Sequence, residues 1–264
     1  MNEPAPRSLH HSGALIYSLL FFLLVAMRLP VAHRVVSEGT DMVDELNLTL
    51  SGVDRFIGVP FTNVHWPGMV NQFLLVPTVG TDFLFASHFA PTPSAFIDYL
   101  ANVYREPWHV LWLARILVVV VIAAGFTGLA AALSAYTGRR WEPVMGVVAL
   151  TSLASLWPYT YWASADGMAI GLFALATAAA IVQPPPGGRG SGMPVLAGAL
   201  MGLVLASRTT FFPGVLLLTA FRWMNSGERR WRLCGIFGCA TACCQVAACP
   251  SWWVEPVRFL RAGR

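Results

Sequence analysis

Three carboxylates lie close together in the segment TDMVDELNL near the start of the chain. If this segment is helical, Asp41, Asp44 and Glu45 stand at positions i, i+3 and i+4 and therefore share one face. Carboxylates this close repel one another, which raises the proton affinity of one of them or favours a divalent cation. The pattern suits a general base or a metal site. The structural alternative is a first helical turn, capped by Thr40, whose acids complement the helix dipole.

Two further charged side chains interrupt apolar sequence much later in the chain. Asp166 stands in WPYTYWASADGMAIGLFALA, where an aromatic turn passes directly into an apolar run. A carboxylate inside a membrane span costs about 2.5–3.5 kcal/mol, so an acid kept there is a functional candidate, with an interfacial helix start as the alternative. Arg208, in LASRTTFFPG, separates two short apolar segments, where a cation could hold a phosphate or simply anchor the chain at the membrane interface.

Composition indicates which elements must position these residues. Of the 264 residues, 56% are hydrophobic and only 11% are charged, and the mean hydropathy is +0.61. Soluble domains carry about a quarter charged residues, so a deficit of this size means that lipid solvates much of the surface. All 17 basic residues are arginines, which suits a GC-rich bacterial genome. They are scattered between apolar segments, without the basic stripe of a nucleic-acid-binding surface.

Seven apolar segments are candidates for membrane spans. They cover residues 13–29, 110–136, 143–156, 167–183, 194–206, 211–224 and 233–248. Crossing the hydrocarbon core takes about 17–25 helical residues, so the third, fifth and sixth are expected to be broken, tilted or half-buried helices. The sequence therefore predicts an all-α fold, a polytopic transmembrane helical bundle of about seven spans that forms one domain over residues 1–264.

The distribution of charge predicts the orientation of this bundle. With the N-terminus in the cytoplasm, the positive-inside rule is obeyed by the arginines of the cytoplasmic connections. These are Arg139, Arg140, Arg189, Arg222, Arg229, Arg230 and Arg232. The loop over residues 30–109, with eight acidic residues against three arginines, then lies outside the cytoplasm. We expect a multi-pass protein of a bacterial cytoplasmic membrane.

This long first loop is expected to have structure of its own, because loops of such length without it are uncommon. Residues 93–104 place Phe96, Tyr99, Leu100 and Val103 on one face, the pattern of a helix lying on the membrane surface. A second juxtamembrane helix is expected over residues 41–51. Between the two, proline and glycine are expected to break HWPGMVNQFLLVP into a turn and a short apolar segment.

Taken in order, these motifs resemble the C-type fold of membrane glycosyltransferases. The bacterial relatives of dolichyl-phosphate-mannose protein mannosyltransferases and aminoarabinose transferases are the most similar in pattern. The resemblance covers residues 13–256 and rests on order and spacing rather than on any single specific motif. Its elements are Asp44-Glu45 in TDMVDELNL, His65 in VHWPGMVNQFLLVP, Arg115 in EPWHVLWLARIL, Asp166 in SADGMAIGLFAL, and Arg208 in LASRTTFFPG.

The resemblance implies transfer of a sugar from a polyprenyl-phosphate donor to a lipid, glycan or protein acceptor on the outer face of the membrane. It implies that Asp44 acts as general base or with a divalent metal ion, and that Glu45 and Asp166 bind the metal or orient the acceptor. Asp44 and Asp166 are the expected metal ligands. The residues expected to bind substrate are Arg208 for the donor phosphate, joined by Arg115 and His65.

Two departures from the family pattern leave alternatives open. The stretch after His65 lacks the family's consecutive prolines, and the chain is shorter than typical members, as an N-terminal catalytic half, a truncated product or a minimal variant would be. A membrane subunit that keeps the fold without turnover is one alternative. A transporter is another, although transporters place polar residues at mid-span, often in repeated halves, and this sequence shows no such repeat.

Overall fold

The computed structural model describes part of the chain, and within that part the chain is helical. The described residues are 9–38, 49–50, 53, 69–88, 92–156, 158–160, 163–182, 192–225, 235 and 238–243. They form α-helices and short 3-10 turns and contain no β-strand. The predicted all-α class is therefore confirmed for these ranges. The helix expected over residues 41–51 and the seventh span expected over residues 233–248 lie largely outside them.

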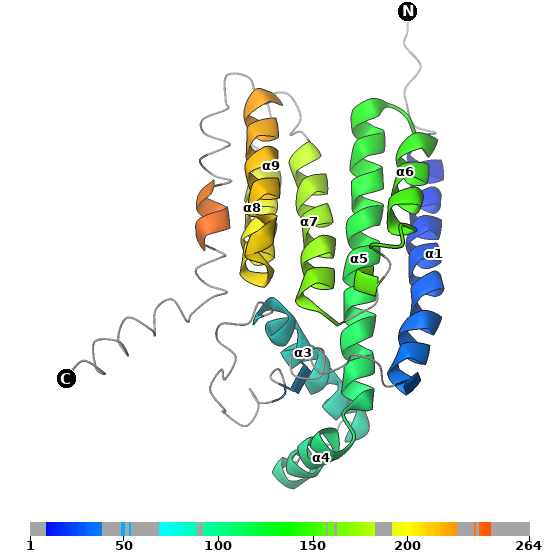
Figure 1. The fold of residues 1–264 in the computed structure, drawn as a ribbon, viewed down its shortest axis with the longest axis vertical. Helices are drawn as coiled ribbons and strands as arrows, with labels where there is room; N and C mark the ends of the chain where they lie inside the picture. Colours follow the sequence, from blue (N-terminus) through cyan, green and yellow to red (C-terminus); the bar gives the residue numbers. More distant parts are fainter. Residues whose placement is uncertain are drawn as a thin grey trace, which may run out of the picture.

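Helices α1 (Leu9–Glu38) and α5 (Trp108–Thr137) form the long axis of a helical bundle (Figure 1). Among the described residues, these two helices are long and apolar enough to cross a membrane, over Gly13–His33 and Trp108–Thr137. Three shorter apolar helices stand beside α5 on the side away from α1. They are α7 (Ala165–Ile181), α8 (Gly192–Ser207) and α9 (Phe212–Asn225). The count of seven spans stays a prediction.

The helices α5 and α7 share the most extensive contact between described elements. Two glycines permit it. A Cβ atom added at Gly125 would collide with the carbonyl oxygen of Gly171, and one added at Gly171 would lie 3.0 Å from the backbone nitrogen of Ile122. Small residues at a helix interface let the backbones approach and gain van der Waals contact, which is a main source of helix association in lipid.

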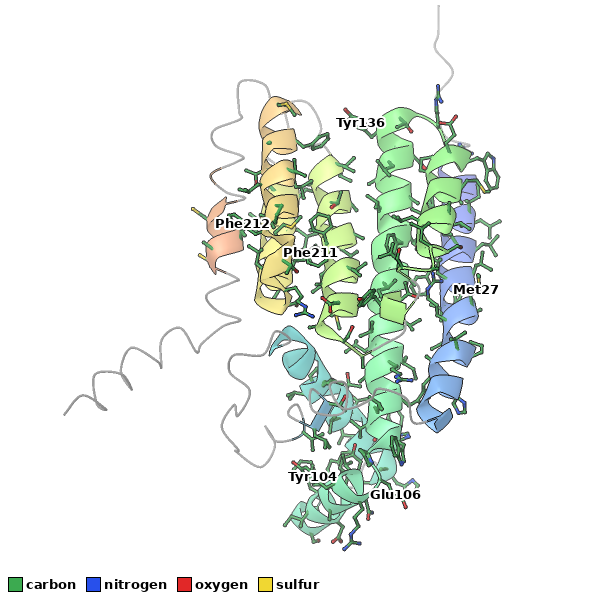
Figure 2. The ribbon with its side chains drawn as sticks, in the orientation of Figure 1. Met27, Tyr104, Glu106, Tyr136, Phe211 and Phe212 are labelled. Carbon is green, nitrogen blue, oxygen red and sulfur yellow. The ribbon has the colours of Figure 1, made fainter. Side chains whose placement is uncertain are left out.

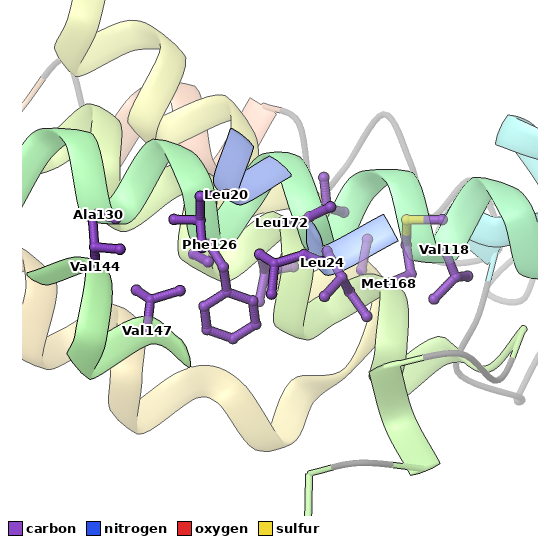
Figure 3. Packing of buried hydrophobic residues seen from close by; sticks show 14 residues of the cluster. Leu20, Leu24, Val118, Phe126, Ala130, Val144, Val147, Met168 and Leu172 are labelled. Carbon is purple, nitrogen blue, oxygen red and sulfur yellow. The ribbon is translucent and has the colours of Figure 1, made fainter. Parts of the chain in front are cut away.

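One apolar core joins five of the described helices, α1, α5, α6 (Trp141–Thr151), α7 and α8, around this contact (Figure 3). Its largest members are Leu20 and Leu24 of α1, Val118 and Phe126 of α5, Val144 and Val147 of α6, and Met168 and Leu172 of α7. A second cluster joins α8 and α9 to the other face of α7, where Ala176 and Ala180 pack with Met201 and Leu218. The helix α7 is therefore packed on both sides.

The predicted third span, residues 143–156, is helical only as far as Thr151. The 11 residues of α6 rise about 16 Å, roughly half of the hydrocarbon core of a bilayer. A helix that ends inside a bundle leaves carbonyl groups in need of donors. The buried guanidinium of Arg28 on α1 meets this need, because its Nη2 donates to the carbonyl oxygen of Thr151 at 3.1 Å. Its positive charge also complements the C-terminal end of the α6 dipole.

Two helices of the first loop, α3 (Met69–Ala86) and α4 (Pro93–Arg105), lie at the end of the bundle where α5 begins (Figure 1). The prediction for residues 93–104 is confirmed, and the helix starts where the Thr92 side chain accepts a hydrogen bond from the backbone nitrogen of Ala95 at 3.2 Å. The short apolar segment expected before it is instead part of an 18-residue helix that continues through Pro77. A proline inside a helix usually bends or breaks it, yet this helix continues through Pro77.

Much of the apolar face of α4 packs against other helices, and the expectation that this helix lies on the membrane surface stays a prediction. Leu100 and Val103 are buried in a cluster with Val110 of α5, and Phe96 and Tyr99 lie against the ring of Phe83 on α3. An amphipathic pattern predicts that a face is covered and does not say by what. Here α3 and α5 cover it.

Candidate functional site

The bundle has two distinct ends, and two of the candidate residues, Asp166 and Arg208, lie together toward one of them. Tyr104 and Glu106 mark the end at which α4 runs into α5, and Tyr136 marks the opposite end of α5 (Figure 2). The helix α3 contacts both α7 and α8, so the first loop meets the start of α7 and the end of α8 at the first of these ends. Which side of a membrane this end faces stays a prediction.

Asp166 and Arg208 form a bidentate ion pair at this end. The Nε and Nη2 atoms of Arg208 donate to the two carboxylate oxygens of Asp166 at 2.5 and 2.6 Å. Asp166 lies in the first turn of α7, which begins where the Ser164 side chain accepts from the backbone nitrogen of Gly167. Arg208 directly follows the last residue of α8. The two residues are predicted individually as site residues, and the structure brings them together across 42 positions of sequence.

The pair is partly accessible, which decides what it can do chemically. The Arg208 side chain is 35% exposed and that of Asp166 is 28% exposed. A planar guanidinium matches phosphate as well as carboxylate, so an arriving phosphate would share Arg208 with Asp166 or displace it. Asp166 in turn lies at a helix N-terminus, where the helix dipole stabilises its charge. The geometry therefore supports a site at which a phosphate replaces the carboxylate of Asp166 as the partner of Arg208.

Arg115, predicted to bind substrate, lies elsewhere. Its side chain is fully buried, and its Nη1 donates to the carbonyl oxygen of Ala32 on α1 at 2.8 Å. The contact is between α5 and α1, whereas Arg208 lies between α7 and α8. This placement gives Arg115 a structural contact, and its predicted part in binding the donor stays untested.

The remaining predicted site residues lie outside the described residues. These are Asp44, Glu45 and His65. Their convergence on Asp166 stays a prediction. Within the described ranges, no group of three or more histidine, cysteine, aspartate or glutamate side chains is arranged to hold a metal ion. A metal site that uses Asp166 would therefore need ligands from the rest of the chain, and both oxygens of Asp166 already accept from Arg208.

A second polar cluster, missed by sequence reasoning, joins α3, α4 and α5. One oxygen of Asp82 accepts a hydrogen bond from the hydroxyl of Tyr99 at 2.7 Å, and the other lies 2.9 Å from Nε2 of His109. Asp82 is 17% exposed and His109 is 64% exposed. In sequence Asp82 is one of many loop acids, and separations of 17 and 27 positions from its partners leave no local signal.

The pKa of Tyr99 reports on its environment, so the contacts of this cluster can be tested by varying the pH. Burial raises the pKa of the Tyr99 phenol well above its ordinary value, and the hydrogen bond to Asp82 and the negative charge of Asp82 raise it further. A raised pKa means that the stability from this contact is fully present below about pH 10. It is lost as the pH rises from there through the pKa of the folded state.

We expect Tyr99 to stay neutral at pH values where exposed tyrosines ionise. An absorbance titration at the phenolate band, comparing the native chain with Tyr99→Phe in detergent, checks this. The difference curve should show ionisation of Tyr99 displaced to higher pH. A difference curve with its midpoint near pH 10 would show that Asp82 and Tyr99 are not in contact.

A groove opens between α3 and α5 beside Asp82. Its volume is about 430 Å³, and it is lined by Pro77, Thr78, Thr81, Asp82, Phe85 and Leu113. Leu113 stands one helical turn after His109, so His109 lies near one edge of the groove.

Comparison with known protein families, characterised proteins and solved structures found no match to this chain. The family resemblance drawn from sequence motifs therefore stays a prediction, and function must be argued from the described residues.

Proposed function

We propose that this chain is a membrane glycosyltransferase that moves a sugar from a polyprenyl-phosphate donor to a lipid, glycan or protein acceptor. The observation that carries the proposal is the partly exposed Asp166–Arg208 pair, held at the end of the bundle where the first-loop helices meet α7 and α8. A cation in this position suits the phosphate of a donor whose prenyl chain stays in lipid.

Placement in a membrane is supported by the outer surface of the bundle. Helix α1, which contains one of the two candidate spans, and helix α9 expose large apolar side chains, among them Phe22, Leu217 and Met224, each more than half exposed. Water disfavours contiguous apolar surfaces of this kind, whereas lipid solvates them. We propose a multi-pass protein of a bacterial cytoplasmic membrane, with a cytoplasmic N-terminus and the Asp166–Arg208 pair on the outer side.

In the proposed reaction, Arg208 binds the donor phosphate, whose negative charge grows as the sugar leaves. Asp44 takes the proton of the acceptor hydroxyl. The acceptor oxygen forms a bond to the anomeric carbon, the bond from that carbon to the phosphate oxygen breaks, and polyprenyl phosphate leaves with the electron pair. Glu45 and Asp166 orient the acceptor. A divalent metal ion, if held by Asp44 and Asp166, would supply additional positive charge beside the phosphate.

Replacing Asp44 by asparagine tests the proposed base. We expect Asp44→Asn to lower sugar transfer from a polyprenyl-phosphate donor in membranes by about 10²–10⁴-fold, the usual contribution of a general base. The amount of protein in the membrane should not change. Asp98→Asn is the matched control, because Asp98 is an exposed acid of the same loop. Transfer by Asp44→Asn equal to that by Asp98→Asn would refute the role of Asp44.

A non-catalytic membrane subunit with the same fold is the second candidate, and one observation favours it. Asp166 and Arg208 form two short hydrogen bonds with each other, as expected of an ion pair whose only role is to hold α7 and α8 together. Structural and ligand-binding roles of this pair predict different results when the two charges are exchanged.

A further inference from the structure

The groove between α3 and α5 presents hydrogen-bond acceptors on its polar wall. Asp82 is an acceptor only, so the ring nitrogen of His109 that contacts it must be the one carrying the proton. The hydroxyl of Thr81 donates to the carbonyl oxygen of Pro77 at 2.7 Å, which leaves the Thr81 oxygen as an acceptor.

Charge narrows the class of ligand further. The residues that line the groove include one carboxylate, Asp82, and no basic side chain, while His109 contacts Asp82 from outside the lining. Two hydrogen bonds from Tyr99 and His109 use part of the acceptor capacity of Asp82, which is about four lone-pair sites for a carboxylate. A phosphate or carboxylate ligand would be repelled by the negative charge of Asp82 and would meet hydrogen-bond acceptors where it needs donors. A cation with N–H donors is attracted by this charge and can donate to these acceptors.

The apolar wall favours the same ligand. The ring of Phe85 is 61% exposed and lines the groove together with Leu113. A cation beside an aromatic ring is attracted by its quadrupole, by about 0.5–1 kcal/mol at exposed sites. The groove also lies beside the first turns of α5, which is a candidate span.

We propose that this groove binds a primary ammonium group, with Asp82 as the counter-charge, Thr81 as a hydrogen-bond acceptor and Phe85 as a ring beside the cation. The inference does not depend on the proposed sugar transfer. The ammonium group could belong to a free amine or to the ethanolamine headgroup of a membrane lipid, and the two sources can be separated by experiment.

Free ethanolamine and ethylene glycol are the matched probes, because they differ in charge and hardly in size. With the full chain purified in detergent, saturation-transfer NMR titrations should show ethanolamine binding at least about tenfold more tightly than ethylene glycol. That ratio corresponds to the lower end of the advantage of a charged hydrogen bond. Equal affinities would overturn the proposal in favour of a neutral hydroxyl ligand.

Variants test which residues bind. Asp82→Asn should weaken ethanolamine binding about tenfold or more, with Asp98→Asn as the control that should leave it unchanged. Because Asp82 also holds three helices together, Phe85→Leu provides a second test on an exposed side chain, with an expected weakening of about two- to fivefold. Binding that persists unchanged in both Asp82→Asn and Phe85→Leu would refute the site.

Nanodiscs distinguish the lipid source. If the lipid headgroup binds, discs that contain phosphatidylethanolamine should raise the melting temperature of the native chain above that in phosphatidylglycerol discs, and Phe85→Leu should reduce the difference. If only free ethanolamine binds, the melting temperatures in the two discs should agree while the NMR titration still depends on Asp82. If neither free ethanolamine nor the phosphatidylethanolamine headgroup binds, the proposal is overturned.

Discussion

Exchanging the charges of the Asp166–Arg208 pair is expected to rescue folding without rescuing sugar transfer. Each single variant, Asp166→Arg or Arg208→Asp, places two like charges where a bidentate pair now stands. We expect each to lower the free energy of unfolding by about 1–3 kcal/mol, a range reduced from that of fully buried pairs because both side chains are about a third exposed.

The double variant restores opposite charges and should recover part of this loss. Recovery should be incomplete, because arginine at position 166 would stand at the N-terminus of α7 and oppose the helix dipole. Thermal unfolding of all four proteins in detergent gives the coupling energy as a double-mutant cycle. Transfer from a polyprenyl-phosphate donor, measured on the same proteins, should stay lost in the double variant, since the cation is no longer at position 208.

The two readouts separate the two candidate functions. Recovery of both stability and transfer would show that the pair has only a structural role, in which it holds α7 and α8 together. Recovery of stability alone supports Arg208 as a ligand of the donor phosphate. No coupling in stability would mean that the ion pair is absent in the protein.

The largest effect on stability is expected at Gly125, where α5 and α7 approach most closely. A methyl group at this position would meet the carbonyl oxygen of Gly171, which is backbone and cannot rotate away. Gly125→Ala must therefore separate the two helices, and we expect a loss of about 1–3 kcal/mol, with Gly125→Leu preventing assembly of the bundle. Unfolding in detergent, followed by far-UV circular dichroism, measures this.

Gly128, less than one turn further along α5, is the matched control. A Cβ atom there would lie 3.7 Å from the Leu175 side chain, an ordinary contact. Gly128→Ala should therefore be neutral or stabilise the protein by about 0.5–1 kcal/mol through helix propensity. Similar destabilisation by Gly125→Ala and Gly128→Ala would show that no close backbone contact exists at Gly125.

Sequence patterns predicted the helices well where an apolar run ends in a clear cap or break. The helix over 93–104 begins at Thr92 followed by proline, and α5 ends at Gly138, whose positive φ of 71° favours glycine. The sequence predicted only a short apolar segment where α3 begins, and it did not predict that the helix continues past Pro77 to Ala86. The sequence predicted a short or broken third span, but it gave no sign that Arg28, more than a hundred positions earlier, contacts the end of α6.

The sequence could single out candidate residues but not the contacts between them. Asp166 and Arg208 stand out because each is a charge within apolar sequence. Their pairing depends on how α7 packs on α8, which no local pattern reports. The same holds for Asp82, Tyr99 and His109, which come from three helices and resemble ordinary polar residues of a loop.

The contact between Arg28 and Thr151 has a consequence for biosynthesis. Arg28 lies within the first candidate span, and the acceptor of its Nη2 is separated from it by 123 positions. If α1 enters the bilayer as it is made, its guanidinium meets lipid or snorkels to the surface until α6 has been synthesised and has docked. The guanidinium of Arg28 then gains its partner on α6 only after residue 151 has been synthesised.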